Sequence, residues 1–140
     1  MMKIDKILLD NLTTQAKESP RLRMNLDLRN SDADSSQRML NAIEPGSVVP
    51  IHRHRTTSEV VVMLRGRAVQ YLYDEQGLET DAVLLAAGAL DGDGVPGAVP
   101  GMTIGKGQWH KLVALESGTV IFEAKDGPYE PISPEDILSM

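Results

Sequence analysis

The residues best suited to chemistry lie in one short stretch that contains two of the chain's three histidines, His52 and His54. Residues two apart on a β-strand point to the same side, so these imidazoles can address one point while Arg53 points away. Glu59 follows after a short turn and can add a carboxylate oxygen. The chain has no cysteine, so a bound metal ion must be held by such nitrogen and oxygen ligands, a set that divalent transition metals favour.

The same stretch resembles the first cupin motif, position for position. Gly46 is followed by five residues, His52-x-His54, four residues, Glu59, six residues and Gly66. The segment 105–110, Gly-Lys-Gly-Gln-Trp-His, resembles the second cupin motif and supplies its glycine and its histidine. It departs from that motif at position 105, where proline is usual, and at position 114, where asparagine is usual. Neither position is a ligand.

The resemblance implies a metal site made of His52, His54, Glu59 and His110. It also implies an all-β cupin fold, the double-stranded β-helix or jelly-roll barrel. Beyond the motifs, the chain resembles the WbuC-type cupin-fold metalloproteins, small bacterial proteins often associated with surface-polysaccharide gene clusters. The matching segments are 23–30, 37–39, 44–46, 52–54, 109–110 and 122–129. This family is defined by its fold and metal and has no settled reaction.

Three imidazoles and one carboxylate would leave two positions of a six-coordinate metal ion open for water or substrate. An open position distinguishes a catalytic site from a structural one. The ion would act as a Lewis acid on a substrate oxygen or, as iron(II), would bind dioxygen. The ligands do not choose between iron, zinc, manganese and nickel.

Strand alternation indicates which side chains accompany the ligands. If Glu59 faces inward, Val61 and Met63 share its side and give an apolar wall. Glu123 and Lys125 share one face of the last strand. If that face is inward, Glu123 is a candidate general base and Lys125 a candidate anion clamp. The alternative is a solvated outer face.

Four more residues are candidates for substrate binding. Arg38 is either a pocket cation or a charge at the barrel rim. Tyr71 and Tyr73 share a face of one strand, and they either contact substrate or pack with a solvated hydroxyl. Trp109, beside His110, either packs in the core or stacks on a ring substrate.

The elements that must position these residues follow from periodicity. Residues 4–18 predict the one long helix, with apolar residues at four-residue spacing, and Pro20 stops it. Residues 21–36 are polar and irregular and are expected to wrap the core. Eight strand-like runs then predict a sandwich or barrel. They span 38–44, 48–54, 59–65, 67–74, 81–87, 102–105, 110–116 and 119–125.

The C-terminal residues Ser133-Pro134-Glu135-Asp136 read as the start of a short helical turn. At 140 residues the chain has the length of one domain. Its parts are an N-terminal helix and wrapping segment at 1–36, a cupin barrel at 37–131 and a helical tail at 132–140. The glycine-rich loop 88–101 lacks the later ligands of a calcium loop and is expected near a site entrance.

Charge and hydropathy indicate the partners. The net charge of −6 argues against nucleic-acid binding. All eight arginines lie between Arg21 and Arg67, either as surface pairs or as an anion-binding rim. The charged N-terminus resembles neither a signal peptide nor a membrane span, so a cytoplasmic protein is expected. The apolar stripe of the helix favours a homodimer.

Three functions are therefore compatible with the sequence. The first is a metal-dependent enzyme acting on a sugar or other oxygenated, anionic small molecule by isomerisation, epimerisation or hydrolysis, in surface-polysaccharide biosynthesis if the family resemblance extends that far. The second is an iron(II)-dependent dioxygenase. The third is a non-catalytic metal- or sugar-binding module. Fold alone does not decide between them, because cupins host many chemistries.

Overall fold

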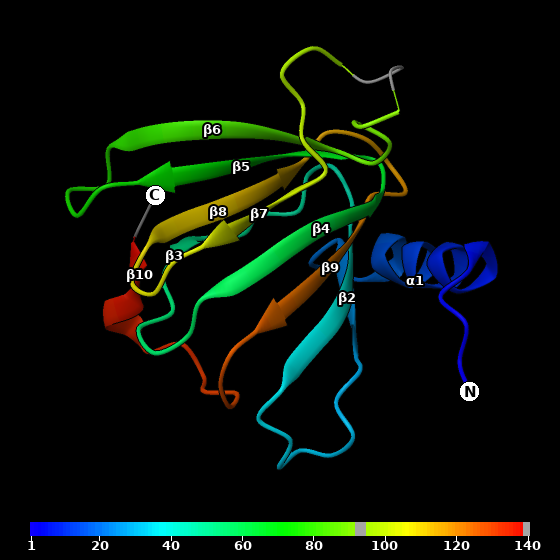
Figure 1. The fold of residues 1–140 in the computed structure, drawn as a ribbon, viewed down its shortest axis with the longest axis horizontal. Coiled ribbons are helices and arrows are strands. Elements are labelled where there is room, and N and C mark those ends of the chain that lie inside the picture. The colour runs from blue at the N-terminus through cyan, green and yellow to red at the C-terminus, as the bar shows by residue number, and fades with distance from the viewer. Residues whose placement is uncertain (92–94, 139–140) are drawn as a thin grey trace.

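Two five-stranded sheets face each other, as the computed structural model shows for residues 1–91 and 95–138 (Figure 1). One sheet has the order β1-β2-β9-β4-β7 and the other β10-β3-β8-β5-β6. The elements are α1 (Lys6–Glu18), β1 (Arg23–Asp27), β2 (Gln37–Ile43), β3 (Ile51–His52), β4 (Glu59–Arg65), β5 (Arg67–Tyr73), β6 (Glu79–Ala86), β7 (Gly101–Ile104), β8 (Trp109–Ala114), β9 (Val120–Lys125), the 3-10 helix η1 (Pro134–Asp136) and β10 (Ile137–Leu138). The strands of both sheets pair antiparallel. This is the jelly-roll architecture that the cupin motifs implied.

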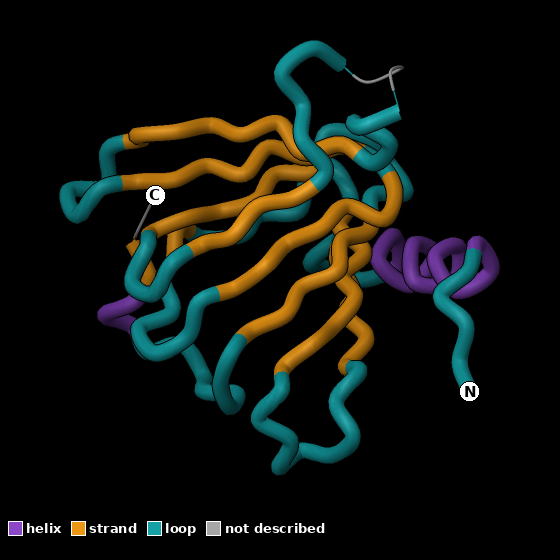
Figure 2. Tube along the Cα trace, in the orientation of Figure 1, coloured by secondary structure: helices purple, strands orange, loops and turns teal. Residues whose placement is uncertain are grey.

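Helix α1 confirms the predicted N-terminal helix and lies against the first sheet (Figure 2). The side chain of Asp5 caps it by accepting a hydrogen bond from the Leu8 backbone N–H at 3.0 Å. Its apolar face, with Leu12 and Ala16, packs on Leu40 of β2. The sheet therefore covers much of the stripe that favoured a homodimer, and the dimer stays a prediction. Among the described residues, no helix is long and apolar enough to cross a membrane.

Strand β1 differs from the sequence expectation, which treated residues 21–36 as an irregular wrapping segment. It pairs with β2 from Arg23 opposite Ile43 to Asp27 opposite Met39. Met24 and Leu26 pack into the cluster beneath α1. The irregular segment is limited to the turn between Asp27 and Gln37.

The C-terminal tail is also more ordered than a helical turn. The predicted start is present, because η1 begins at Pro134 directly after Ser133. The Ser133 hydroxyl does not cap the backbone but donates to the Asp136 carboxylate at 3.0 Å. Strand β10 follows and pairs with β3, with Ile137 opposite His52. The tail thus adds an edge strand beside a predicted metal ligand.

The main core lies between the two sheets. It is formed by Ile43, Val61, Met63, Ala68, Leu85, Ile104, Leu112, Ala114 and Ile121. Val61 and Met63 are 2% and 5% exposed and share the inward side of β4 with Glu59, as alternation predicted. Gly66, between β4 and β5, has φ 86°, and a Cβ there would lie 2.8 Å from Thr119 Cα. The second glycine of the first motif is thus required by close packing.

Candidate metal centre

The three histidines converge on one point at the inner face of the second sheet. His52 lies opposite His110 in the pairing of β3 with β8, and His54 follows the end of β3. One ring nitrogen from each histidine can be chosen such that all three lie within 4.8 Å of one another. The ring centroids of His52 and His110 are 4.3 Å apart. This spacing suits three imidazoles that share one metal ion.

Backbone carbonyls fix the orientation of two of these rings. Nδ1 of His52 lies 2.9 Å from the Pro50 carbonyl oxygen, and Nδ1 of His110 lies 2.7 Å from the Gln108 carbonyl oxygen. A carbonyl only accepts, so each Nδ1 carries the proton and donates it. The Nε2 atoms are then the nitrogens available to a metal ion, which is how ligating histidines are usually held.

His54 is held through its backbone. Its carbonyl oxygen accepts a hydrogen bond from the Gly107 N–H at 2.8 Å, which ties the segment after β3 to the turn before β8. Gly107 adopts φ 77°, a left-handed conformation that favours glycine. The glycine of the second motif therefore connects the two ligand-bearing segments.

Glu59, the fourth predicted ligand, is the first residue of β4. Its Oε1 lies 2.8 Å from His110 Nε2, and its Oε2 lies 3.9 Å from His54 Nε2. Burial raises the pKa of Glu59, but the hydrogen bond and charge of His110 outweigh this and hold it at about 2. The carboxylate is therefore ionised and available as an anionic ligand.

His52 and His54 are neutral at pH 7, as metal ligands must be, whereas Glu59 favours the protonated form of His110. Burial and the neighbouring His110 lower the pKa of His52 to about 4. Burial and Lys125 lower the pKa of His54 to about 4. Burial also lowers the pKa of His110, but the hydrogen bond to Glu59 outweighs it and raises the pKa above the ordinary value. The donor set fits a divalent ion that takes the place of this one proton.

Glu123 and Lys125 on β9 lie beside the ligands and face inward. Lys125 Nζ is 3.8 Å from Glu59 Oε2 and 3.7 Å from Glu123 Oε2. Glu123 Oε1 accepts a hydrogen bond from Asn41 Nδ2 at 3.0 Å. Burial and the charge of Glu59 raise the pKa of Glu123. The geometry thus brings both candidate catalytic residues to the histidine cluster and Glu59, while their roles stay predictions.

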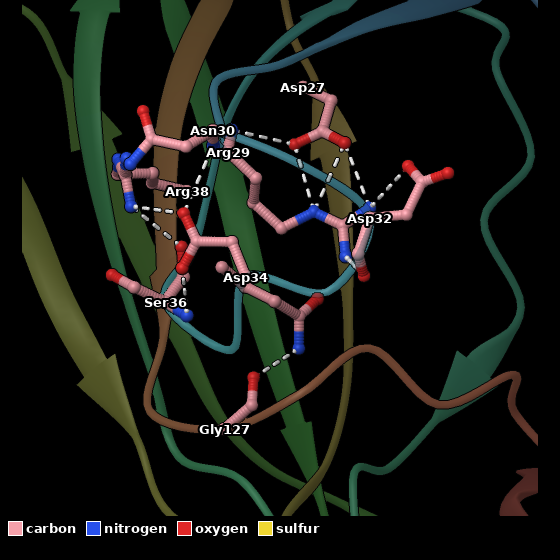
Figure 3. Close-up of polar contacts among 9 residues, drawn as sticks. Asp27, Arg29, Asn30, Asp32, Asp34, Ser36, Arg38 and Gly127 are labelled. Atoms are coloured by element: carbon pink, nitrogen blue, oxygen red, sulfur yellow. Dashed lines mark hydrogen bonds and ion pairs between the residues drawn. The ribbon is translucent and has the colours of Figure 1, made fainter.

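The four candidate substrate-binding residues lie elsewhere. Arg38 is 3.3 Å from the Asp34 carboxylate and donates to the Ser36 carbonyl at 3.0 Å, in the turn between β1 and β2 (Figure 3). The other three, Tyr71, Tyr73 and Trp109, pack in a separate cluster on the second sheet. None of the four lines the cavity that contains the histidines.

Alternation explains this outcome. In β8 the inward positions are His110 and Leu112, and in β5 the inward position is Gln70, so the aromatic side chains point outward. In β2 the inward positions include Gln37 and Asn41, so Arg38 lies on the opposite side. The sequence predicted which residues share a face but not which face is inward.

A cavity of about 820 Å³ surrounds the histidine cluster and lies between the sheets. It is in the range of small-molecule sites. Asn25, Asn41 and Gln70 line it and were not singled out from the sequence. Residues 128–133 with 135 and 136 border it as well, whereas the described part of the loop 88–101 does not. The described residues of this loop thus give no support to its expected place near the site entrance, and residues 92–94 lie outside the described residues.

Asp136 joins the C-terminal tail to the segment that contains His52 and His54. Its Oδ1 accepts hydrogen bonds from Arg53 Nε at 2.8 Å and from Arg55 Nε at 2.6 Å. Arg53 also lies over the Trp109 ring, with its guanidinium carbon 4.5 Å from the centroid. The arginines alternate with His52 and His54, so Asp136 anchors one side of the strand while the histidines occupy the other. No sequence signal singled out this carboxylate.

Residues 4–85 match a family described as a domain of unknown function, DUF6016. The chain belongs to the DUF6016 family. The match covers the helix, the first cupin motif and most of β6, and it ends before the segment that carries His110. No curated protein matches this DUF6016 chain in sequence.

Solved structures show the fold of this DUF6016 chain. It superposes on oxalate oxidase in complex with the substrate analogue glycolate with a TM-score of 0.62 and 12% identity, covering 82% of this chain and 56% of that one. For the capsular polysaccharide assembling protein CapF from Staphylococcus aureus the TM-score is 0.62 at 18% identity, covering 81% and 30% of the two chains. For a mutant of the oxalate decarboxylase OxdC from Bacillus subtilis the TM-score is 0.55 at 19% identity, covering 75% and 25%.

These likenesses establish the cupin fold. The DUF6016 chain spans between 25% and 56% of the lengths of these three proteins. Together with the histidine cluster, the fold fits a metal-binding cupin.

Proposed function

We propose that this protein is a metal-dependent enzyme that acts on a sugar or another oxygenated, anionic small molecule by Lewis-acid chemistry. One observation carries the proposal. The histidine cluster lies in a cavity of about 820 Å³ that also contains an inward-facing carboxyl group and ammonium group, those of Glu123 and Lys125. A purely structural metal site has no use for such a cavity or for open coordination positions.

His52, His54, Glu59 and His110 would hold the ion, which is iron, zinc, manganese or nickel in this proposal. When bound, it supplies Lewis-acid polarisation of a substrate oxygen. Lys125 contributes a fixed positive charge, held between the carboxylates of Glu59 and Glu123, that orients an anionic oxygen of the substrate. Val61 and Leu112 provide apolar wall that excludes water.

Glu123 is the proposed proton carrier. Asn41 holds its Oε1, so Oε2 is the oxygen that accepts a proton from the substrate or returns it. Lys125, 3.7 Å from Oε2, stabilises the carboxylate form during the exchange. Isomerisation of a hydroxylated substrate can proceed with one such carrier beside a polarised oxygen, whereas epimerisation also needs a proton donor on the opposite face of the substrate.

The comparisons support this class of ligand. One structural neighbour was solved with the substrate analogue glycolate, another is named for the decarboxylation of oxalate and a third for the assembly of capsular polysaccharide, and all three of these compounds are rich in oxygen. The resemblance to WbuC-type proteins points to the same area, surface-polysaccharide biosynthesis. The substrate and its place in that biosynthesis are part of the proposal.

The test is turnover by protein loaded separately with iron(II), manganese(II), nickel(II) or zinc(II). Aldose phosphates, ketose phosphates and short hydroxycarboxylates are followed by NMR, with oxygen uptake recorded in parallel. Glu123→Gln is expected to lower turnover about 100-fold or more at unchanged metal content. Glu135→Gln is the matched control, because the Glu135 side chain is 76% exposed at the cavity border.

Three results would contradict the proposal. Equal turnover in Glu123→Gln and wild type would remove Glu123 as the proton carrier. Oxygen uptake that requires iron(II) would replace Lewis-acid chemistry by dioxygenase chemistry. Ligand binding without turnover under every metal would leave a non-catalytic binding module.

A further inference from the structure

The arginines fall into two groups by their partners. Six of the eight lie within 4.0 Å of a carboxylate: Arg29, Arg38, Arg53, Arg55, Arg65 and Arg67. Arg21 and Arg23 have no such partner among residues 1–91 and 95–138. Both of these arginines line the cavity that contains the histidines. The cavity is therefore lined by two arginines that, among the described residues, have no carboxylate within 4.0 Å.

The guanidinium group of Arg23 and the backbone of Arg21 are held in place. Arg23 Nη1 donates to the Val48 carbonyl at 3.0 Å and to the Ser47 hydroxyl at 3.4 Å. The Ser47 hydroxyl in turn donates to the Arg21 carbonyl at 2.7 Å. Burial and the neighbouring charge of Arg21 lower the pKa of Arg23. Arg23 is half-buried and Arg21 is exposed, and two neighbouring like charges repel each other unless an anion joins them.

The backbone between them is strained. Leu22 has φ 56°, and no other described residue except glycine has a positive φ. Leucine rarely adopts this left-handed conformation, which costs on the order of 1 to 3 kcal/mol. Hydrogen bonds from Leu22 N–H to the Ser19 carbonyl at 3.0 Å and from Glu44 N–H to the Leu22 carbonyl at 2.9 Å hold it. The strain occurs where the chain turns from α1 into β1 and brings both guanidinium groups to the cavity.

The arginines are within reach of a ligand bound at the metal centre. Arg23 contacts the carbonyl of Val48, which precedes His52 by four residues. Even a fully extended chain separates the Cα atoms of these two residues by at most about 14 Å. A molecule the size of a sugar phosphate, bound between arginine and histidine side chains that extend into the same cavity, can contact both.

We propose that Arg21 and Arg23 bind the phosphoryl group of the substrate whose oxygen atoms approach the metal ion. This inference rests on the proposed function, because it assigns the anionic group of the same substrate. A phosphate monoester carries a charge of roughly −1.5 to −2 at neutral pH, which matches two guanidinium groups. A carboxylate would leave one guanidinium without a counter-charge, and its two oxygens offer fewer acceptors.

The test uses inorganic phosphate and methyl phosphate as probes on full-length, chelator-treated protein, titrated by calorimetry at neutral pH. The variants are Arg21→Gln and the double variant Arg21→Gln/Arg23→Gln. The matched control removes two charges elsewhere, in Arg67→Gln/Lys17→Gln. Arg67 pairs with Glu116 and does not line this cavity, and Lys17 is exposed on α1.

The double variant is expected to bind phosphate at least about tenfold more weakly than wild type, since it loses charge-assisted hydrogen bonds. Arg21→Gln alone is expected to lose several-fold, which provides a test if the double variant fails to fold. The control is expected to stay within about twofold of wild type, and acetate to bind at least about tenfold more weakly than phosphate.

Equal phosphate affinity in wild type and in a folded double variant would overturn the assignment, as would equal affinity for acetate and phosphate. The failure of the proposed function looks different. Phosphate binding that depends on both arginines in a protein without metal-dependent turnover would support the anion subsite and reject the enzyme. Metal-dependent turnover, together with phosphate binding that is the same in wild type and in the arginine variants, would support the enzyme and reject the anion subsite.

Discussion

The two faces of the sheet β1-β2-β9-β4-β7 have opposite characters. On the face toward α1, Leu40 and Ala42 of β2 are almost completely buried in an apolar cluster. On the other face of the same strand, Gln37 and Asn41 line the cavity, and Asn41 holds Glu123. Successive residues of one strand thus serve packing and chemistry in alternation.

The difference between the two faces explains how a small barrel can have a polar cavity. Apolar burial is provided by the helix-covered face and by the core between the sheets, so the cavity does not have to supply it. The polar groups of the cavity are matched instead by specific partners. Among the described residues, no buried side-chain nitrogen or oxygen lacks a hydrogen-bond partner.

Leu40→Ala, on the face toward α1, has the largest expected effect on stability. Leu40 is fully buried beneath α1, so the free energy of unfolding is expected to fall by about 2 to 5 kcal/mol through lost burial and a residual cavity. Metal affinity is expected to stay within about twofold, because the side chain faces away from the ligands. Urea unfolding and metal titration at a temperature where the variant is folded measure both. Loss of metal affinity in the folded variant would break the separation of the faces.

Glu59→Gln is the complementary change on the cavity side. The amide keeps the shape of the side chain but removes the anionic ligand beside His110 and His54. Metal affinity is expected to fall about 100-fold or more, beyond what outer partners of a ligand typically contribute. Competition with a metallochromic chelator measures this, with Glu135→Gln as the control. Unchanged affinity would mean that Glu59 is not a ligand.

Asp136→Asn tests the attachment of the C-terminal tail. Hydrogen bonds from Arg53, and then from Arg55 and Ser133, outweigh the effect of burial and lower the pKa of Asp136 to about 2. A depressed carboxyl pKa stabilises the folded state above the ordinary value of 3.8, and this contribution is lost as pH falls toward 2. Wild type is therefore expected to unfold at a higher temperature than the variant at pH 6, and the gap is expected to close below pH 4.

Thermal unfolding of both proteins between pH 2.5 and pH 7 measures that gap. Glu135→Gln again serves as the control, because Glu135 lies next to Asp136 but is largely exposed. A gap that stays constant down to pH 2.5 would show that the ion pairs with Arg53 and Arg55 do not stabilise the tail.

Tyr71→Phe has the smallest expected effect. Tyr71 packs against the outer cluster of the second sheet and does not line the cavity. Stability is expected to change by less than about 0.5 kcal/mol, and the affinities for metal and ligand by less than about twofold. Calorimetric titration of the variant provides the check. A marked loss of ligand affinity would restore Tyr71 as a substrate-binding residue and contradict the assignment of the faces.

Motif spacing and strand alternation were enough to predict from the sequence that Glu59, Val61 and Met63 share one side of β4. The same rules placed His52 and His54 on one side of their strand, and the structure brings them to His110. Strand β1 could also have been predicted, because Met24 and Leu26 alternate with Arg23 and Asn25. The polar turn residues that follow obscured this pattern.

Other features depend on contacts between distant segments. Alternation indicates that Tyr71 and Tyr73 share a face, but only the packing of the second sheet determines that this face is the outer one. Strand β10 has two residues, and Asp136 directly before it binds Arg53 and Arg55 from a segment about 80 positions earlier in the chain. No local sequence pattern encodes such a contact.

The most direct test of a metal-binding cavity is metal analysis of protein purified without chelator, added metal or metal-affinity resin. Wild type is compared with His52→Ala/His54→Ala by elemental mass spectrometry, after circular dichroism has shown that both are folded. Near-stoichiometric metal is expected in wild type, and its loss is expected in the double variant. Equal, substoichiometric metal in both proteins would contradict both expectations.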